Sequence, residues 1–324
     1  MEDSLQLPEV ADLLEARRAL AGVAVRTPVL RADGLDALTS GRLFFKAECL
    51  QRTGSFKLRG AYNRVRSLGE EEWRRGLITV SAGNAALGAA YAARVAGALL
   101  VVVMPETAVP EKLAAVAALG ARIESRGVTN ATEAFARLAE LRRDHGYTLV
   151  HPFDDPLVIA GAGTVTWELL EEVPDLELLA VPTSGGGLLA GALLAAGALA
   201  RGVRVYGVQP AGADGMVRSL AAGAPTAAER IETVADGLTA PCPGALNFEI
   251  IRRHAAGVLT VDDAAILDAM ARLIRELRVV VEPAGATALA AVLADPRFHG
   301  RRVGVILSGG NASPERIRQV LAPA

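Results

Sequence analysis

Short apolar runs alternate with longer helix-like stretches through the first half of this chain, and this alternation restricts the fold more than any other feature. The expected strands lie near 77–80, 99–103, 121–124 and 147–150, and the expected helices lie near 84–96, 110–119 and 130–144. Strands that alternate with helices are typical of a parallel sheet covered on both faces. The pattern therefore predicts an α/β fold.

The same pattern divides the chain into two parts. Residues near 66–150 are expected to form one compact four-stranded unit, and residues 1–65 and 151–324 to form a larger domain. A length of 324 residues, of which 51% are hydrophobic and 4% aromatic, suffices for one large or two modest domains with cores of Ala, Val and Leu. Helices are also expected over Leu7 to Ala21 and from Lys57 to about Leu68.

One lysine stands beside a turn at the expected start of a helix. The stretch TGSFKLRG over 53–60 follows a β-rich run over 43–48. Gly54 and Ser55 are expected to form the turn and the N-cap, which places Lys57 in the first helical turn. The positive helix end and apolar neighbours disfavour the ammonium form, so this amine is a candidate Schiff-base nucleophile. Because most lysines are solvated, Lys57 alone is weak support for catalysis.

Three further segments place a polar or glycine-rich turn directly after an apolar run. They read SAGNAALG over 81–88, VPTSGGGLLAG over 181–191 and VGVILSGGN over 303–311. The first two lead into a helix, whose free N–H groups can bind an anion. The third ends a buried strand, where ligands bind in an open α/β sheet. Each has a structural alternative: Asn84 as a helix cap, the glycines as a flexible turn, and Ser308 as an ordinary turn serine.

The glycine cluster indicates phosphate binding without a nucleotide-binding motif. From Gly185 to Gly187 no Cβ prevents backbone amides from closing around a phosphate. The loop matches neither the Rossmann fingerprint nor Walker A, which ends in Gly-Lys-Ser/Thr.

Together, the four segments resemble the fold type II pyridoxal phosphate enzymes, and specifically the threonine/serine dehydratase and serine racemase family. The resemblance covers nearly the whole chain. It extends to RTPVL over 26–30, HPFDDP over 151–156, IAG over 159–161, TVADG over 233–237 and VEPAGA over 281–286, in the expected order. It implies a fold like the tryptophan synthase β subunit, with two three-layer parallel-sheet domains and pyridoxal 5'-phosphate in the cleft between them.

The resemblance also implies roles for single residues. Lys57 would hold the cofactor as a Schiff base and move the Cα proton, and Ser308 would face the pyridine nitrogen; these two are the expected catalytic residues. The residues implied in cofactor binding are Phe56, Lys57, Asn84, Ser184, Gly185, Gly186, Gly187, Leu188, Glu282 and Ser308. Those implied in substrate binding, through the substrate carboxylate, are Ser81, Ala82, Gly83, Asn84 and Ala85.

A neutral Ser308 favours β-elimination over transamination. A hydroxyl cannot hold a pyridinium as a carboxylate would, so the ring nitrogen stays largely unprotonated and the carbanion weakly delocalised. Weak delocalisation favours prompt loss of a β-leaving group. We therefore predict that Lys57 removes the Cα proton and the β-hydroxyl leaves with a proton, for which the cofactor phosphate is one candidate donor. A β-hydroxy amino acid such as L-threonine or L-serine would yield a 2-keto acid and ammonia.

The chain departs from the family pattern beside the substrate. The family usually follows the asparagine with His-Ala-Gln or His-Gly-Gln, whereas Ala85, Ala86 and Leu87 occupy these positions here. A more apolar pocket would admit a bulkier or more apolar β-hydroxy amino acid. The alternative is a neutral family variation.

Two other departures bear on racemisation and on metal binding. Racemisation needs a second acid or base on the opposite face of the Cα carbanion, and the serine of serine racemases is replaced by Ala82 here, which favours a dehydratase. Some family members bind a divalent cation through two acidic side chains. The matching positions are Gln209 and Gly215, so we predict no metal site, with Asp214 as a turn residue or helix cap.

The composition argues against several other classes of protein. A net charge of -2 and a pI near 6.2 give no sign of a nucleic-acid or anionic-membrane partner. Cys49 and Cys242 lack metal spacing and are expected to be buried thiols in a reducing compartment, and His151 is expected to be structural. The uncharged window 178–200 is interrupted by 182–187, and its halves are too short to span a bilayer.

The two ends of the chain complete the expectations. The acidic start over 1–4 carries no signal-peptide pattern, and the end at Ala324 leaves no room for an appended regulatory domain. We expect a cytoplasmic protein and, by the habit of the family, a homodimer. Three functions stay open: a β-eliminating ammonia-lyase, a racemase or β-replacement enzyme on the same cofactor, and a non-catalytic nucleotide-binding protein in which Lys57 is incidental.

Overall fold

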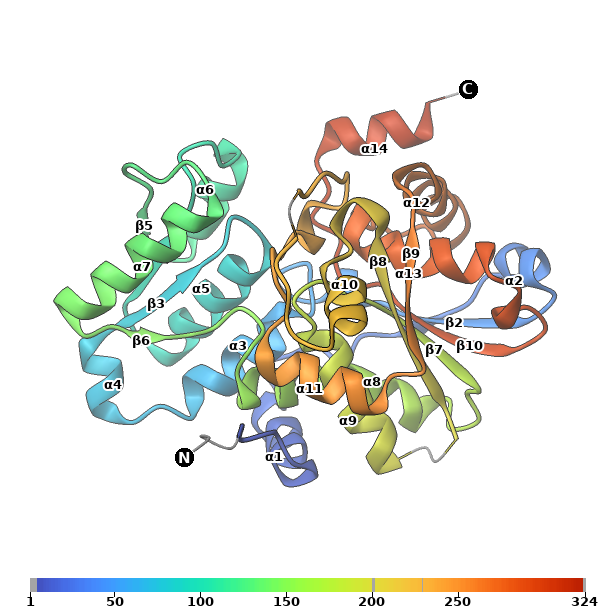
Figure 1. The fold of residues 1–324 in the computed structure, drawn as a ribbon, viewed down its shortest axis with the longest axis horizontal. Helices are drawn as coiled ribbons and strands as arrows, with labels where there is room; N and C mark the ends of the chain where they lie inside the picture. The colour runs from blue at the N-terminus through green and yellow to red at the C-terminus, as the bar shows by residue number, and fades with distance from the viewer. Residues whose placement is uncertain (1–4, 200–201, 229, 323–324) are drawn as a thin grey trace.

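Four parallel strands form the smaller of two sheets in the computed structural model, which describes residues 5–199, 202–228 and 230–322 (Figure 1). The strands are β3 (Leu77–Val80), β4 (Leu100–Val103), β5 (Arg122–Glu124) and β6 (Thr148–Leu149), in the spatial order β5-β4-β3-β6. The helices are α4 (Glu70–Arg75), α5 (Asn84–Ala96), α6 (Pro110–Ala118) and α7 (Ala131–His145). All four strands, and all three helices that were expected between them, begin and end within one residue of their predicted positions.

Alternate residues of the central strands pack into two separate cores, which makes this unit three-layered. All four residues of β4 are buried. Leu100 and Val102 pack with the alanines of α5, whereas Val101 and Val103 pack with apolar residues of α7. A strand covered on both faces needs such a continuous apolar run, which is what the sequence supplies.

The larger sheet has six strands, and five of them are parallel. The strands are β1 (Val29–Leu30), β2 (Arg42–Lys46), β7 (Leu178–Pro182), β8 (Arg204–Pro210), β9 (Gly257–Val261) and β10 (Arg302–Ile306), in the order β1-β2-β10-β7-β8-β9. The larger sheet is parallel except at one edge, where β1 pairs with β2 in the antiparallel sense. A two-residue edge strand of this kind is compatible with an otherwise parallel sheet.

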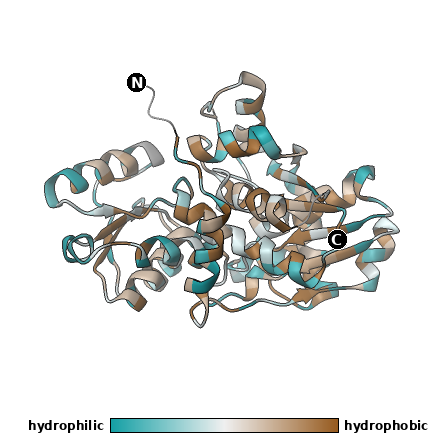
Figure 2. Ribbon diagram, turned by 90° about the horizontal axis from the view of Figure 1, so that it is seen from below, coloured by the Kyte–Doolittle hydropathy of each residue, from teal (hydrophilic) through white to brown (hydrophobic). Residues whose placement is uncertain are grey.

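Helices cover both faces of the larger sheet. One face carries α8 (Pro156–Glu172), α9 (Gly187–Leu199), α10 (Gly215–Ala222) and α11 (Ala245–His254), with α1 (Val10–Leu20) packed on α8. The other carries α2 (Asp33–Thr39), α12 (Asp263–Leu277), α13 (Pro283–Ala294) and α14 (Pro314–Leu321). Short 3-10 helices lie at η1 (Glu48–Leu50), η2 (Ala211–Ala213), η3 (Asp236–Leu238) and η4 (Pro296–Phe298). Hydrophobic positions gather on the strands and inner helices (Figure 2).

The helix that carries the candidate lysine begins at Lys57, one residue later than a cap at Ser55 would place it. α3 (Lys57–Arg66) has Phe56 at its N-cap, and no side chain caps it. The expectation that Ser55 caps this helix is wrong, because Ser55 pairs with Gly309 in an isolated antiparallel bridge and the backbone is still extended there. The Ser55 hydroxyl is buried and has no hydrogen-bond partner among the described residues.

Some expectations concern residues outside the described part of the chain. Residues 1–4 and Ala324, on which the expectations about the two ends rest, lie there, as does Ala200 at the end of the uncharged window. Within the described residues, no helix combines the length and the apolar character needed to cross a membrane.

Candidate active site

Lys57 differs from the other lysines of this chain in its partners. The chain contains three lysines. Lys46 Nζ donates to Glu168 at 2.7 Å, and Lys112 Nζ donates to Asp236 at 2.5 Å. Among the described residues, no carboxylate forms an ion pair with Lys57. Lys57 is therefore the lysine whose positive charge is least compensated.

The amine of Lys57 is enclosed by backbone and by an aromatic ring. Lys57 Nζ donates to the carbonyl oxygen of Pro152 at 2.8 Å and lies 5.2 Å from the centre of the Phe56 ring. Burial disfavours the ammonium form and lowers the pKa of Lys57 to about 8. At pH 7 about a tenth of this amine is then neutral and able to act as a nucleophile, far more than for an ordinary lysine.

Ser308 lies directly beside the start of the lysine helix. It follows β10, and its carbonyl oxygen accepts from the Phe56 N–H at 3.1 Å. Ser308 is buried. Because β10 and β7 are parallel neighbours, the turn that contains Ser308 and the loop that follows β7 leave the sheet at the same edge.

The glycine loop between β7 and α9 presents backbone N–H groups at this edge. In the part of the chain that the structure describes, the N–H groups of Ser184, Gly185 and Gly186 donate no hydrogen bond. Gly187 begins α9, so the helix N-terminus adds further free donors. Leu188 follows in the first turn and is buried. The loop can thus bind an anion through its backbone.

Glycine is required in this loop because neighbouring segments pack closely against it. Gly186 has a φ of +101°, and a Cβ there would lie 2.7 Å from Cβ of Asn247. A Cβ on Gly185 would lie 2.6 Å from the Phe153 ring, and one on Gly187 would lie 2.9 Å from the Phe153 carbonyl oxygen. The Ser184 hydroxyl accepts from the Ala240 N–H at 2.9 Å. These contacts fix the loop and leave its N–H groups for a ligand.

Asn84 connects the smaller unit to the larger one. It is the first residue of α5, whose N-cap is Gly83, so the alternative that Asn84 merely caps the helix is wrong. Its Nδ2 donates to Glu282 Oε1 at 2.5 Å, and its Oδ1 accepts from Asn311 Nδ2 at 2.7 Å. Burial raises the pKa of Glu282 to about 7, and the negative charge of Asp236 adds to this effect.

The expected substrate loop is closed on itself and carries no charge. The Ser81 hydroxyl accepts from the Gly83 N–H at 3.1 Å. Ala82 and Leu87 pack against the apolar core that lies between α5 and the smaller sheet. Ala85 is half-buried. The loop is thus short and mainly apolar, as expected beside the substrate. Its one hydroxyl group is that of Ser81.

Sequence reasoning missed one buried amide at this site. Asn247 on α11 donates from Nδ2 to the carbonyl oxygens of Phe153 and Gly185, at 3.1 Å and 2.9 Å, and its buried Oδ1 has no partner among the described residues. No motif that indicates a ligand lies near Asn247 in the sequence. By contrast, His151 and Asp154 lie in the HPFDDP segment over 151–156, which the sequence analysis singled out.

That segment holds the lysine, the glycine loop and α11 together. His151 Nδ1 accepts from the Asp154 N–H at 2.7 Å, which is the structural use expected of this histidine. Burial lowers the pKa of His151 to about 4, so the ring stays neutral. The Asp154 carboxylate accepts from backbone N–H groups at the start of α11, including that of Ala245 at 2.9 Å.

At the positions that bind a divalent cation in some family members, the structure shows contacts that stabilise α10. Gln209 is buried, and its Oε1 accepts from the N–H groups of Met216 and Val217 at 3.0 Å and 3.2 Å. Gln209 therefore caps α10, while Asp214 occupies the N-cap position without a capping hydrogen bond, and its Oδ1 accepts from Arg218 Nε at 2.7 Å. The absence of a divalent cation site stays a prediction from Gln209 and Gly215.

Comparison with known proteins identifies the family. The pattern of the family described as "Pyridoxal-phosphate dependent enzyme" matches residues 21–309. The chain belongs to this family. L-threonine ammonia-lyase of Thermotoga maritima is 38% identical over 313 residues, which are 96% of this chain and 77% of that protein. β-Hydroxyaspartate dehydratase of Paracoccus denitrificans is 38% identical over 97% of this chain and 99% of that protein. The structure of maize serine racemase is similar with a TM-score of 0.92 and 36% identity, over 97% of each chain.

The site fits the cofactor of the pyridoxal-phosphate family in three respects. An amine with a lowered pKa can bind the aldehyde covalently. Unused N–H groups at a helix N-terminus can hold the phosphate. Ser55 and Asn247 have buried polar atoms without partners in the described part of the chain, as expected of a site shaped for a polar ligand.

Proposed function

We propose that this chain catalyses the β-elimination of water from a β-hydroxy amino acid, such as L-threonine or L-serine, to give a 2-keto acid and ammonia. The bound pyridoxal phosphate supplies the electron sink for the Cα carbanion. The observation that carries the proposal is the amine of the half-buried Lys57, which donates to the Pro152 carbonyl and has a pKa lowered to about 8. An amine that titrates there can take a proton from Cα and release it again.

The other residues hold and orient the cofactor in this proposal. Phe56 packs beside the ring, Asn84 hydrogen-bonds the ring hydroxyl, and Glu282 orients the Asn84 amide. The N–H groups of the segment from Ser184 to Leu188, which includes Gly185, Gly186 and Gly187, bind the phosphate. The substrate carboxylate is held by the turn that comprises Ser81, Ala82, Gly83, Asn84 and Ala85.

Ser308 supports elimination as the reaction. Its hydroxyl is neutral, so it can hydrogen-bond the pyridine nitrogen without keeping a proton on it. Glu282 is buried close to this turn, but its carboxylate is bonded to Asn84. With Ser308 as its partner, the ring nitrogen would carry no proton and the cofactor would supply a weaker electron sink, which would favour loss of the β-hydroxyl over transamination.

Ala82 supports a lyase over a racemase. Inversion at Cα requires a second group that exchanges a proton on the face opposite to Lys57. A methyl group cannot do this. Two of the relatives named above are lyases and one is a racemase, so the family alone does not decide between the reactions.

The substrate class is proposed from the same loop. No cationic side chain occurs from Ser81 to Leu87, so nothing in this segment offers a partner to a second carboxylate. We propose a substrate with an uncharged side chain rather than a hydroxyaspartate.

We further propose that residues 66–150 form a small mobile domain and that residues 1–65 and 151–324 form the cofactor-binding domain. Support comes from the strand order, because each sheet draws all its strands from one of these parts. The family resemblance supports a homodimer in the cytoplasm, and light scattering of the purified protein would test the dimer.

Release of keto acid tests the proposed reaction. The purified protein would be given pyridoxal phosphate and a panel of L-serine, L-threonine, their D and allo forms, 3-phenylserine and 3-hydroxyaspartate, with Lys57→Ala as the control. Turnover of a substrate with an uncharged side chain, lost in the variant, supports the proposal. Keto acid from the Lys57→Ala protein would refute it.

A further inference from the structure

A cavity lies away from the candidate active site, between α1, α3 and α8. Its volume is about 520 Å³. The polar residues in its wall are Arg17, Arg18, Arg26, Arg59, Thr164 and Glu168. Cavities that bind small metabolites have volumes of about 300–1,000 Å³. The size of this cavity therefore suits a small organic ligand.

The cavity is separate from the lysine site although both use the same helix. Arg59 follows Lys57 by two positions on α3. Residues two apart on an α-helix point in directions about 160° apart around the helix axis. Lys57 thus contacts the Pro152 carbonyl on one side of α3, while Arg59 faces Glu48 and Glu168 on the other.

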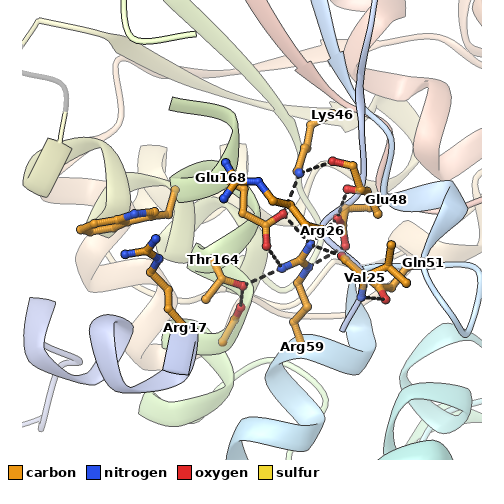
Figure 3. A network of polar contacts seen from close by, with 12 residues as sticks. Arg17, Val25, Arg26, Lys46, Glu48, Gln51, Arg59, Thr164 and Glu168 are labelled. Carbon is orange, nitrogen blue, oxygen red and sulfur yellow. Dashed lines mark hydrogen bonds and ion pairs between the residues drawn. The ribbon is translucent and has the colours of Figure 1, made fainter. Parts of the chain in front are cut away.

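Positive charge exceeds negative charge around this cavity. Figure 3 shows the buried part of the ion-pair network, in which Arg59 contacts Glu48 and Glu168, and Lys46 also contacts Glu168. The ion pairs in and around the wall comprise six cations and four carboxylates, namely Arg17, Arg18, Arg26, Lys46, Arg59 and Arg66 with Glu15, Glu48, Glu168 and Glu171. The wall itself contains four of these cations and one of these carboxylates, so the cavity carries a net positive charge.

Two of the arginines share one carboxylate. Arg17 and Arg26 contact the two oxygens of Glu171 at 2.5 Å and 3.0 Å, and Trp167 Nε1 also donates to Glu171 at 2.8 Å. A guanidinium has several N–H donors, so a single shared carboxylate leaves most of them unused. Those donors are available to another oxyanion.

The arrangement is also partly ordered in advance. The Arg17 guanidinium stacks on the Trp167 ring at 4.7 Å, which restricts its rotamers. The Arg26 side chain is 56% exposed and remains accessible from solvent. A ligand would thus meet one guanidinium that stacking already restricts and one that is exposed, and ordering the restricted one costs less entropy on binding.

We propose that this cavity binds a small organic anion that carries a carboxylate or phosphate group, with Arg17, Arg18 and Arg26 as its cationic partners. Guanidinium groups bind both kinds of oxyanion in bidentate geometry. The proposal is independent of the reaction assigned above, because none of these arginines belongs to the lysine site.

Calorimetric titration of the pyridoxal-phosphate-loaded protein tests this site at low ionic strength. The loaded protein is used because the cofactor's own phosphate then occupies the glycine loop. Inorganic phosphate is the probe in one series and succinate in the other, and the series that binds identifies the recognised group. Saturable binding of either probe is expected, and binding of neither would overturn the proposal.

Matched variants locate the binding. Arg26→Gln and Arg17→Gln are each expected to weaken binding by about tenfold or more, the usual effect of losing a charge-assisted hydrogen bond. Arg26→Lys should retain part of the affinity. Arg318→Gln on α14 is the control, because Arg318 also pairs with one glutamate and its side chain is 73% exposed. Binding that neither Arg17→Gln nor Arg26→Gln weakens would overturn the proposal.

Discussion

Asn84 Nδ2 lies 2.5 Å from Glu282 Oε1, and this hydrogen bond joins the first residue of α5 to the residue that precedes α13. The two residues are 198 positions apart and belong to the units around the smaller and the larger sheet. If Asn84 holds the ring hydroxyl of the cofactor, its Nδ2 donates one N–H to that hydroxyl and the other to Glu282. The charge on Glu282 then influences both the contact between the units and the binding of the cofactor.

Replacement of Glu282 by Gln is expected to flatten the pH dependence of stability. Burial, together with the charge of Asp236, raises the pKa of Glu282 from 4.5 to about 7. The folded protein therefore favours the protonated form, whose stabilising effect is complete below pH 4.5 and is lost as the pH rises through about 7. The effect is at most about 3 kcal/mol. Urea unfolding of the cofactor-free protein across this range measures it, and an equally steep slope in the Gln variant would contradict the account.

Pyridoxal phosphate is expected to react with one lysine only. Because the pKa of Lys57 is lowered to about 8, the neutral fraction and the rate of covalent capture should rise as the pH rises through that value and then level off. Borohydride reduction followed by peptide mass analysis identifies the modified residue among the three lysines. Lys57→Arg keeps the charge and removes the reactive amine. An adduct on Lys46 or Lys112 would argue against the proposed site.

Gly186→Ala is expected to weaken both folding and cofactor binding. The residue has a φ of +101°, and an added Cβ would lie 2.7 Å from Cβ of Asn247. Strain and overlap of this kind cost about 1–3 kcal/mol. Gly197→Ala on α9 is the matched control, since its Cβ would meet nothing within 4 Å; it should stabilise the helix by about 0.5–1 kcal/mol. Unfolding curves and cofactor titrations report both effects, and equal behaviour of the two variants would show that the loop is not tightly packed.

Ser308→Ala and Ser308→Asp are expected to have different effects on the reaction. Loss of one neutral hydrogen bond should lower kcat/KM by about tenfold or less. An aspartate would keep a proton on the pyridine nitrogen and should slow elimination further while a larger share of turnovers ends in transamination. Keto acid yield and the cofactor absorption spectrum distinguish these outcomes. Faster elimination in the Asp variant would show that a neutral partner is not what favours this reaction.

The bounds of helices and strands could be predicted from the sequence where apolar periodicity and turn residues over a short stretch determine them. The helix over 84–96 follows from a strand, a turn and an alanine-rich stretch, and its bounds agree with those of α5. The Ser55 cap failed because Ser55 pairs with Gly309, a residue distant in the chain. Such long-range contacts leave no trace in local periodicity.

In the candidate site, too, the sequence predicts what local patterns determine and misses what depends on long-range contacts. Lys57, the glycine loop and Ser308 stand out because each follows an apolar strand, and parallel strands bring their carboxyl ends to one edge of a sheet. Asn247 could not be found this way, since its two acceptors come from segments more than sixty positions away. The contact of Asn84 with Glu282 is equally invisible in the sequence, because the spacing of two segments says nothing about which side chains meet.

If Lys57 drives β-elimination from a β-hydroxy amino acid, the cofactor-loaded protein must release 2-keto acid, and the rate of this release is the decisive measurement. We expect turnover of L-threonine or L-serine, or of another substrate in the panel whose side chain is uncharged, and no activity in Lys57→Ala. Absence of keto acid from every substrate, with the cofactor still bound to Lys57, would contradict the proposed reaction and leave racemisation or β-replacement as the activity to be measured.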